Sequence, residues 1–206
     1  MEKICKFIDF KYFKNVAVIF GIFTVCLLLL LGFNVDYIPE NSLLENIQLI
    51  ALVAGFILCL KAKNHKVLFR FGAMVIFLMF MRELSYGRCI FCQMPDNPHM
   101  FYPWSHYKYG WLAHVIVGIY IACAFLYAII NKIWIDIKDV FAKVRFPFLD
   151  LIMMAFLTVM QLLGEKTLDS TVLEETAEFS LYCAIFALVY YYYKRTSVLE
   201  CNSTKE

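Results

Sequence analysis

The sequence predicts an all-α membrane protein, a polytopic helical bundle with six transmembrane helices in a single domain over residues 1–206. Hydrophobic residues make up 62% of the chain and its mean hydropathy is +0.68, well above the values of ordinary soluble domains. Six apolar stretches each approach the about 20 residues that cross a bilayer core of about 30 Å. Lysine and arginine gather in alternate connecting segments, which predicts that both termini are cytoplasmic.

The six predicted spans are separated by short polar segments. They cover residues 15–35, 42–60, 67–84, 111–130, 147–164 and 172–193. The first is longer than the apolar core of a signal peptide, so we interpret it as a retained span. Residues 131–146 are basic and amphipathic, which predicts a helix lying on the cytoplasmic membrane surface.

The longest segment between spans, residues 85–110, is predicted to be an outer loop. It contains three prolines, which break helices, and many tyrosine and tryptophan residues, which favour the membrane interface. Two interpretations remain open for this loop. It either folds back on the outer leaflet as a lid or re-entrant segment, or it is an ordinary interfacial loop.

A layer of polar residues is predicted near the outer face, because spans two to six each carry a polar residue at a similar depth. At about 1.5 Å of rise per helical residue, this layer contains Glu45, Glu83, His114, Gln161 and Glu178, with Gln48, Glu174 and Glu175 close to it. An isolated carboxylate is too costly to keep ionised in lipid. We therefore expect these side chains to face one another in a pocket. The alternative is a structural network that fixes helix packing.

This layer contains the candidate functional residues. The candidate catalytic residues are Glu83, Glu178 and Glu45 as acid–base groups, with His114 assisting. The candidate substrate-binding residues are Arg82, Arg88, Gln48, Gln161, Glu174 and Glu175, and the two arginines match the geometry of an anionic headgroup. Glu45, Glu83, His114 and Glu178 are also candidate ligands for a divalent metal. No Glu-x-x-His or His-Glu-x-x-His motif supports a metal, so the cofactor stays open.

Two of the eight cysteines, Cys89 and Cys92, fall in the predicted outer loop. A disulfide can persist on that side of a membrane, and a Cys-x-x-Cys pair can also be redox-active. Quinone-linked thiol oxidoreductases typically use a second outer cysteine pair, which this chain lacks. The sequence therefore favours a structural disulfide or two free thiols over a catalytic redox pair.

The stretch from Arg82 to Arg88, Arg-Glu-Leu-Ser-Tyr-Gly-Arg, resembles one found in uncharacterised multi-pass bacterial membrane proteins, where it often reads Glu-Glu-Leu-Ser-Trp-Gly. The similarity extends to residues 45–48 and to the glutamate-rich start of the last span. Here Arg82 replaces the first glutamate and Tyr86 replaces the tryptophan. The resemblance implies a bacterial plasma (inner) membrane and groups the glutamates together, and it leaves Cys89 and Cys92 outside the shared pattern. It implies no activity.

Three functions follow as hypotheses. The first is an enzyme that acts on a lipid or lipid-linked substrate at the outer face. The second is a small proton-coupled transporter, although Arg70 and Asp150 are the polar residues of the inner half and both lie at a span boundary. The third is a non-catalytic membrane assembly partner. We expect membrane lipid as a partner, leave a protein partner open, and expect no nucleic acid because the net charge is only +2 and no nucleic-acid motif is present.

Overall fold

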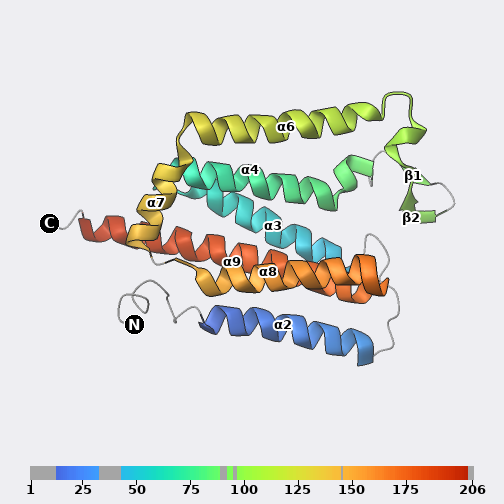
Figure 1. Ribbon diagram of the computed structural model, residues 1–206, viewed down its shortest axis with the longest axis horizontal. Helices are drawn as coiled ribbons and strands as arrows, with labels where there is room; N and C mark the ends of the chain where they lie inside the picture. Colours follow the sequence, from blue (N-terminus) through green and yellow to red (C-terminus); the bar gives the residue numbers. More distant parts are fainter. Residues whose placement is uncertain (1–12, 33–42, 89–91, 95–96, 145, 204–206) are drawn as a thin grey trace.

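The computed structural model describes residues 13–32, 43–88, 92–94, 97–144 and 146–203. Six helices run alongside one another: α2 (Phe13–Gly32), α3 (Leu43–Lys61), α4 (Lys66–Glu83), α6 (Trp111–Ile130), α8 (Phe148–Leu163) and α9 (Thr171–Ser203). The short helix α7 (Ile133–Lys143) crosses one end of the bundle (Figure 1). The opposite end carries a small antiparallel hairpin of β1 (Gln93–Met94) and β2 (Asn97–Phe101). The described part of the chain is therefore predominantly helical.

Four of these helices are long and apolar enough to cross a membrane. Their apolar windows are Asn15–Gly32, Leu44–Lys61, Trp111–Ile130 and Phe148–Leu168. The other two predicted spans fall short of that description. Helix α4 carries Lys66, Arg70, Arg82 and Glu83, and α9 combines charged residues with a run of four tyrosines. The structure therefore supports a membrane protein with four candidate spans.

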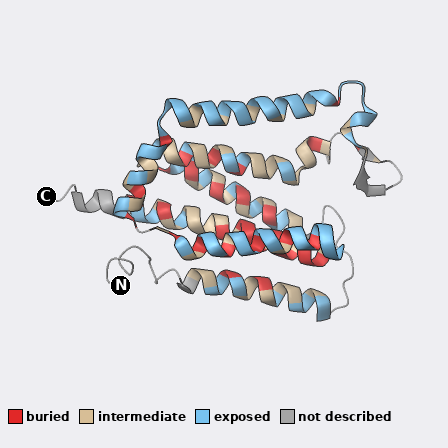
Figure 2. Cartoon of the chain, in the orientation of Figure 1, coloured by how far each residue is buried: buried red, intermediate tan, exposed pale blue. Residues whose placement is uncertain are grey.

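Helix α9 lies at the centre of the bundle and packs against α2, α3 and α8. Its buried face includes Ala177 and Tyr182, neither of which is exposed at all, and buried positions run along its length (Figure 2). Helix α8 presents Met153, Leu157 and Gln161 at intervals of four residues, which places them on one face. The core of the protein is thus built around the last predicted span.

The connection between α8 and α9 is tighter than the sequence predicted. Residues Gly164–Leu168, expected largely in a loop, form a π-helical turn, η4, that continues α8. A Cβ atom at Gly164 would lie 2.7 Å from the backbone nitrogen of Glu174, so a glycine lets the two helices approach. Helix α9 also continues past the expected end at residue 193, because no glycine or proline interrupts it before Ser203.

Helix α7 is the amphipathic segment, and it packs its apolar face on α4. Ile133 and Val140 are buried. On its polar face, Asp136 and Asp139 each lie 3.7 Å from a ring nitrogen of His65, which sits in the turn before α4. A hydrogen bond from Lys143 lowers the pKa of Asp139. These contacts fix the end of the bundle where α2 begins.

Helix α6 is the most peripheral helix. It contacts α4 and the short 3-10 helix η3 (Trp104–His106), and none of its residues is buried. Figure 2 shows it exposed along its length. The sequence predicted that this span contributes His114 to the polar layer, whereas the structure attaches α6 to the outside of α4.

Candidate functional site

A cluster of ionisable side chains lies where α4 and α9 approach the hairpin end of the bundle. It comprises Arg82 and Glu83 from the last turn of α4, and Glu178 and Tyr182 from α9; we call it the glutamate–tyrosine cluster. Arg82 Nη2 forms an ion pair with Glu178 Oε1. The Tyr182 hydroxyl lies 2.6 Å from Glu83 Oε1 and 2.8 Å from Glu178 Oε1. Four polar groups from two helices therefore form one connected network.

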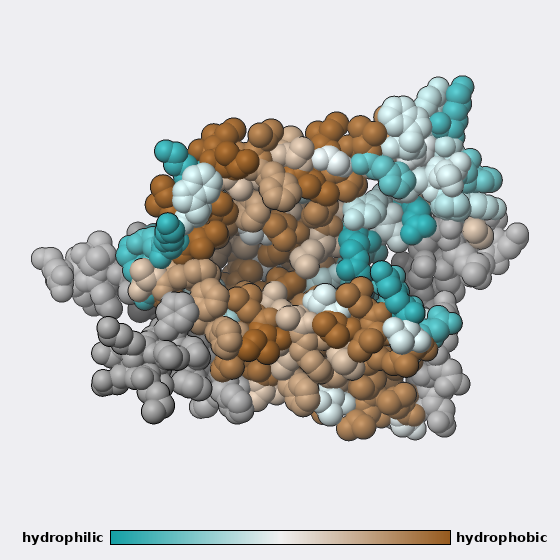
Figure 3. Space-filling view, in the orientation of Figure 1, coloured by the Kyte–Doolittle hydropathy of each residue, from teal (hydrophilic) through white to brown (hydrophobic). Residues whose placement is uncertain are grey.

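The four side chains of the cluster differ in their exposure to solvent, and Glu83 is half-buried. Tyr182 is completely buried and Glu178 is 3% exposed, whereas the Arg82 side chain is 45% exposed. In the space-filling view the molecule is hollowed along its middle, and hydrophilic atoms gather toward the hairpin end of that hollow (Figure 3). Arg82 is therefore the most exposed member of the cluster.

The Tyr182 hydroxyl lies between the two carboxyl groups. It has one hydrogen, which it can donate to Glu83 Oε1, to Glu178 Oε1, or to both as a shared hydrogen bond. Glu178 also pairs with the guanidinium of Arg82. The structure thus places two carboxyl groups on the two sides of one hydroxyl, and one of them has a cationic partner.

A second set of polar groups adjoins this cluster from α3. The Gln48 side-chain nitrogen donates to the backbone oxygen and to Oε2 of Glu175, both at 3.3 Å. Glu45, one turn before Gln48, lies within electrostatic range of both Glu83 and Glu175. Gln48 is fully buried, and its Oε1 has no hydrogen-bond partner. Glutamates from three helices, α3, α4 and α9, thus lie near one another.

The other residues predicted for the site differ in how far they are buried. Gln161 is buried on the face of α8 that packs on α9, while Glu174 and Arg88 are half-buried. His114 is exposed on α6, so the expectation that it faces this layer is wrong. The physical reason is the position of α6, which packs on α4 and η3 rather than closing the ring of helices.

The structure bears on the candidate metal ligands and on one cysteine of the candidate disulfide. In the described ranges, no three His, Cys, Asp or Glu side chains are arranged to hold a metal ion. The proposed ligands Glu83 and Glu178 are instead bridged by Tyr182, and Glu178 already has a cationic partner. Cys92 is a buried free thiol, and Cys89 lies outside the described residues.

Two functional candidates were missed from the sequence. Tyr182 follows Glu178 by four residues on α9, and that spacing places both side chains on one helix face. Asp150, expected at the membrane boundary, is 2% exposed on α8 and its Oδ2 has no hydrogen-bond partner. The i, i+4 spacing was a usable signal for Tyr182, whereas only packing reveals the burial of Asp150.

A strained turn follows the cluster directly along the chain. Ser85, Tyr86 and Gly87 have φ angles of 48°, 53° and 91°. Left-handed conformations cost about 1–2 kcal/mol for a residue with a side chain, and such strain gathers at functional sites. The turn ends α4 immediately after Glu83 and redirects the chain toward the hairpin.

No protein-family model, curated protein or solved structure matches the chain. The function must therefore be argued from the chemistry of the site.

Proposed function

We propose that α2, α3, α4, α6, α8 and α9 all cross a bacterial inner membrane, with both termini on the cytoplasmic side. Helices α4 and α9 run alongside the four apolar helices (Figure 1). The charged residues of α4 lie near its two ends, Lys66 and Arg70 in the first two turns and Arg82 and Glu83 in the last. The start of α2, the end of α9 and helix α7 lie at the same end of the bundle, and the segment from 131 to 146 that includes α7 contains three lysines and an arginine. The positive-inside rule makes that end cytoplasmic.

We further propose that the protein is an enzyme that performs acid–base chemistry on a lipid or lipid-linked substrate at the outer end of this bundle. The observation that carries this proposal is the Tyr182 hydroxyl between Glu83 and Glu178. Glu83 supplies a proton, Glu178 accepts one, and Tyr182 connects the two carboxyl groups. Charged groups at this depth in a membrane protein are functional more often than structural.

Arginine side chains give the site a preference for anionic substrates. Half of the Arg82 side chain is exposed while it still pairs with Glu178. A guanidinium has five N–H donors, so it can hold a carboxylate and still bind phosphate oxygens. Arg88, half-buried just beyond the strained turn, is a second candidate for headgroup binding. A phosphate-bearing lipid headgroup therefore suits this site.

The test is lipid conversion by the purified protein. Wild type, Glu83→Gln and Glu178→Gln would be incubated in detergent with a bacterial lipid extract, and the products followed by mass spectrometry. Loss of general acid–base catalysis lowers rates by about 10²–10⁴-fold, so both variants should convert the wild-type substrate at least about 100-fold more slowly. Equal conversion by wild type and both variants would refute the enzyme proposal.

A proton-coupled transporter is the second candidate, and Asp150 supports it. This carboxylate is buried, has an unpartnered oxygen, and lies near the end of α8 opposite the glutamate–tyrosine cluster. Acidic residues within membrane bundles often form proton relays. In proteoliposomes, pH-dependent flux that Asp150→Asn and Glu83→Gln each abolish would support transport. If both variants are tolerated and a partner co-purifies, the assembly hypothesis gains instead.

A further inference from the structure

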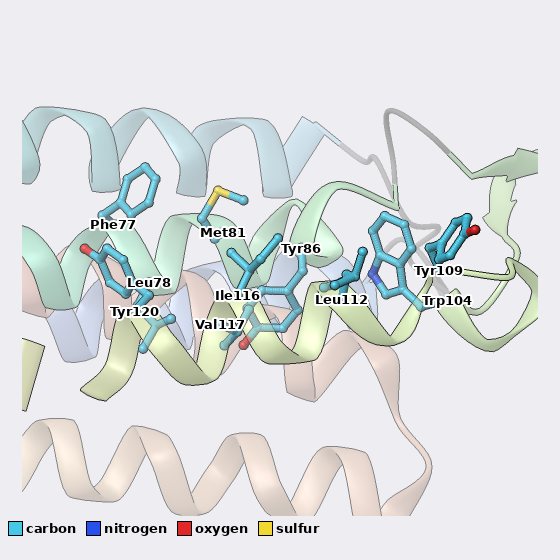
Figure 4. Close-up of a pocket in the computed structure, with 11 residues that line it drawn as sticks. Phe77, Leu78, Met81, Tyr86, Trp104, Tyr109, Leu112, Ile116, Val117 and Tyr120 are labelled. Carbon is cyan, nitrogen blue, oxygen red and sulfur yellow. The ribbon is translucent and has the colours of Figure 1, made fainter. Parts of the chain in front are cut away.

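A cavity lies on the other side of α4, between that helix and α6. Its volume is about 350 Å³, which is within the about 300–1,000 Å³ of small-molecule sites. Phe77 and Tyr120 lie at one end, Trp104 and Tyr109 lie at the other, and aliphatic side chains lie between them (Figure 4). The lining belongs to α4, α6, η2 (Ser85–Gly87) and η3. None of the glutamates of the candidate site lines this cavity.

The cavity is long and narrow along the helix axes. On α6 its lining runs from Leu112 to Tyr120, which at about 1.5 Å per residue corresponds to roughly 12 Å. On α4 it runs from Phe77 to Met81. An elongated apolar space parallel to two helices suits an extended hydrocarbon chain better than a compact molecule.

One polar atom in the lining lacks a partner. Trp104 Nε1 is buried and makes no hydrogen bond, and Figure 4 shows it on the side of the ring that faces Leu112. A buried N–H without an acceptor costs about 1–3 kcal/mol. An acceptor oxygen from a bound molecule at this end of the cavity would remove that cost.

The backbone at the Trp104 end of the cavity has a close approach at Gly110 and a positive φ at Tyr86. A Cβ atom at Gly110 would lie 1.6 Å from the carbonyl oxygen of Trp104, so only glycine lets the chain fold back between η3 and α6. Tyr86, with its φ of 53°, contributes its ring to the same lining. The tight turn and the strained residue therefore both position aromatic rings around the cavity.

We propose that this cavity binds one acyl chain of a diacyl phospholipid, whose ester carbonyl accepts a hydrogen bond from Trp104 Nε1–H. The proposal rests on the membrane placement of α4 and α6 given above and is independent of the acid–base chemistry. Tryptophan and tyrosine favour the headgroup level of a bilayer, where ester carbonyls lie. The chain then runs from Trp104 toward Phe77 and Tyr120, parallel to the neighbouring lipids.

The experiment measures lipid retention by native mass spectrometry. Detergent-purified protein is titrated with diacyl phosphatidylglycerol and with its dialkyl ether analogue, which has the same chains and no ester carbonyl. We expect wild type to retain one ester lipid and to bind the ether lipid about 2- to 10-fold more weakly, the effect of one hydrogen bond. Trp104→Phe should weaken ester binding by the same factor and leave ether binding unchanged.

A second pair of variants tests the cavity itself. Ala113→Phe places a ring inside the cavity and should reduce retention at least about 10-fold, whereas Ala122→Phe, on an exposed part of the same helix, should retain lipid as wild type does. Trp134→Phe, on the exposed side of α7, controls for loss of a tryptophan. Equal binding of ester and ether lipids by wild type, or equal retention of the ester lipid by wild type and Ala113→Phe, would overturn the proposal. Retention is measured without turnover, so this result and the lipid-conversion test can fail separately.

Discussion

Replacing Tyr182 by phenylalanine removes the one hydroxyl that joins the two glutamates, and it keeps the ring that fills the core. Two hydrogen bonds are lost, at 2.6 Å to Glu83 and 2.8 Å to Glu178. Side-chain hydrogen bonds within membranes contribute about 0.6 kcal/mol on average and at most about 1.7. Because both carboxyl groups lose a short bond in a buried site, we expect the free energy of unfolding to fall by about 1–3 kcal/mol.

The assay is reversible unfolding in mixed detergent micelles, followed by helical circular dichroism. Tyr190→Phe is the matched control, since Tyr190 lies on the same helix and is 47% exposed. Surface substitutions of that kind change stability by about 0.5 kcal/mol or less. Infrared spectroscopy adds an independent readout, because the carboxyl band that disappears in Glu83→Gln should shift in Tyr182→Phe. Unchanged stability together with an unchanged band would show that the hydroxyl does not bridge the glutamates.

Two further predictions concern contacts of α9 with its neighbours. Arg82→Ala leaves Glu178 buried without its cation, and we expect the free energy of unfolding to fall by about 2 kcal/mol in the same assay. This is less than the about 3–5 kcal/mol for fully buried pairs, because Arg82 is half-exposed. Adding Glu178→Gln to Arg82→Ala should restore most of that stability, and additive effects of the two substitutions would argue against the ion pair. Gly164→Ala directs a methyl group at the backbone of Glu174 and should lower the free energy of unfolding by about 1–3 kcal/mol. Gly118→Ala is the control, because a Cβ atom there would have nothing within 4 Å, and it should leave the stability unchanged. Equal stability of the two variants would contradict the close approach of α8 and α9.

Helix positions follow closely from the sequence, because apolar runs bounded by polar residues leave few choices. The spans predicted at 111–130 and 147–164 correspond to helices at Trp111–Ile130 and Phe148–Leu163. The amphipathic segment forms α7 for the same reason, since its apolar residues share one face. Hydropathy was less informative for α4 and α9, whose charges and tyrosines lower their apolar character.

The level of the polar layer could also be predicted, but its membership could not. Counting residues along each helix gives the depth of a residue in the membrane. It does not give the rotation of the helix about its axis or the helices against which it packs. Glu83 and Glu178 meet because α4 and α9 turn those faces toward the same space, whereas His114 has a similar predicted depth and is exposed. The contacts that matter join residues 99 positions apart in the chain, and no local pattern encodes them.

The sequence by itself determined that this is a membrane protein of apolar helices with ionisable residues at one level, since length, composition and charge follow directly from the residues. Only the tertiary structure decided that α9 is the centre, that α6 lies outside, and that one tyrosine hydroxyl joins two glutamates. The physical reason is that hydropathy specifies which segments leave water, while side-chain packing between helices specifies which of their faces meet.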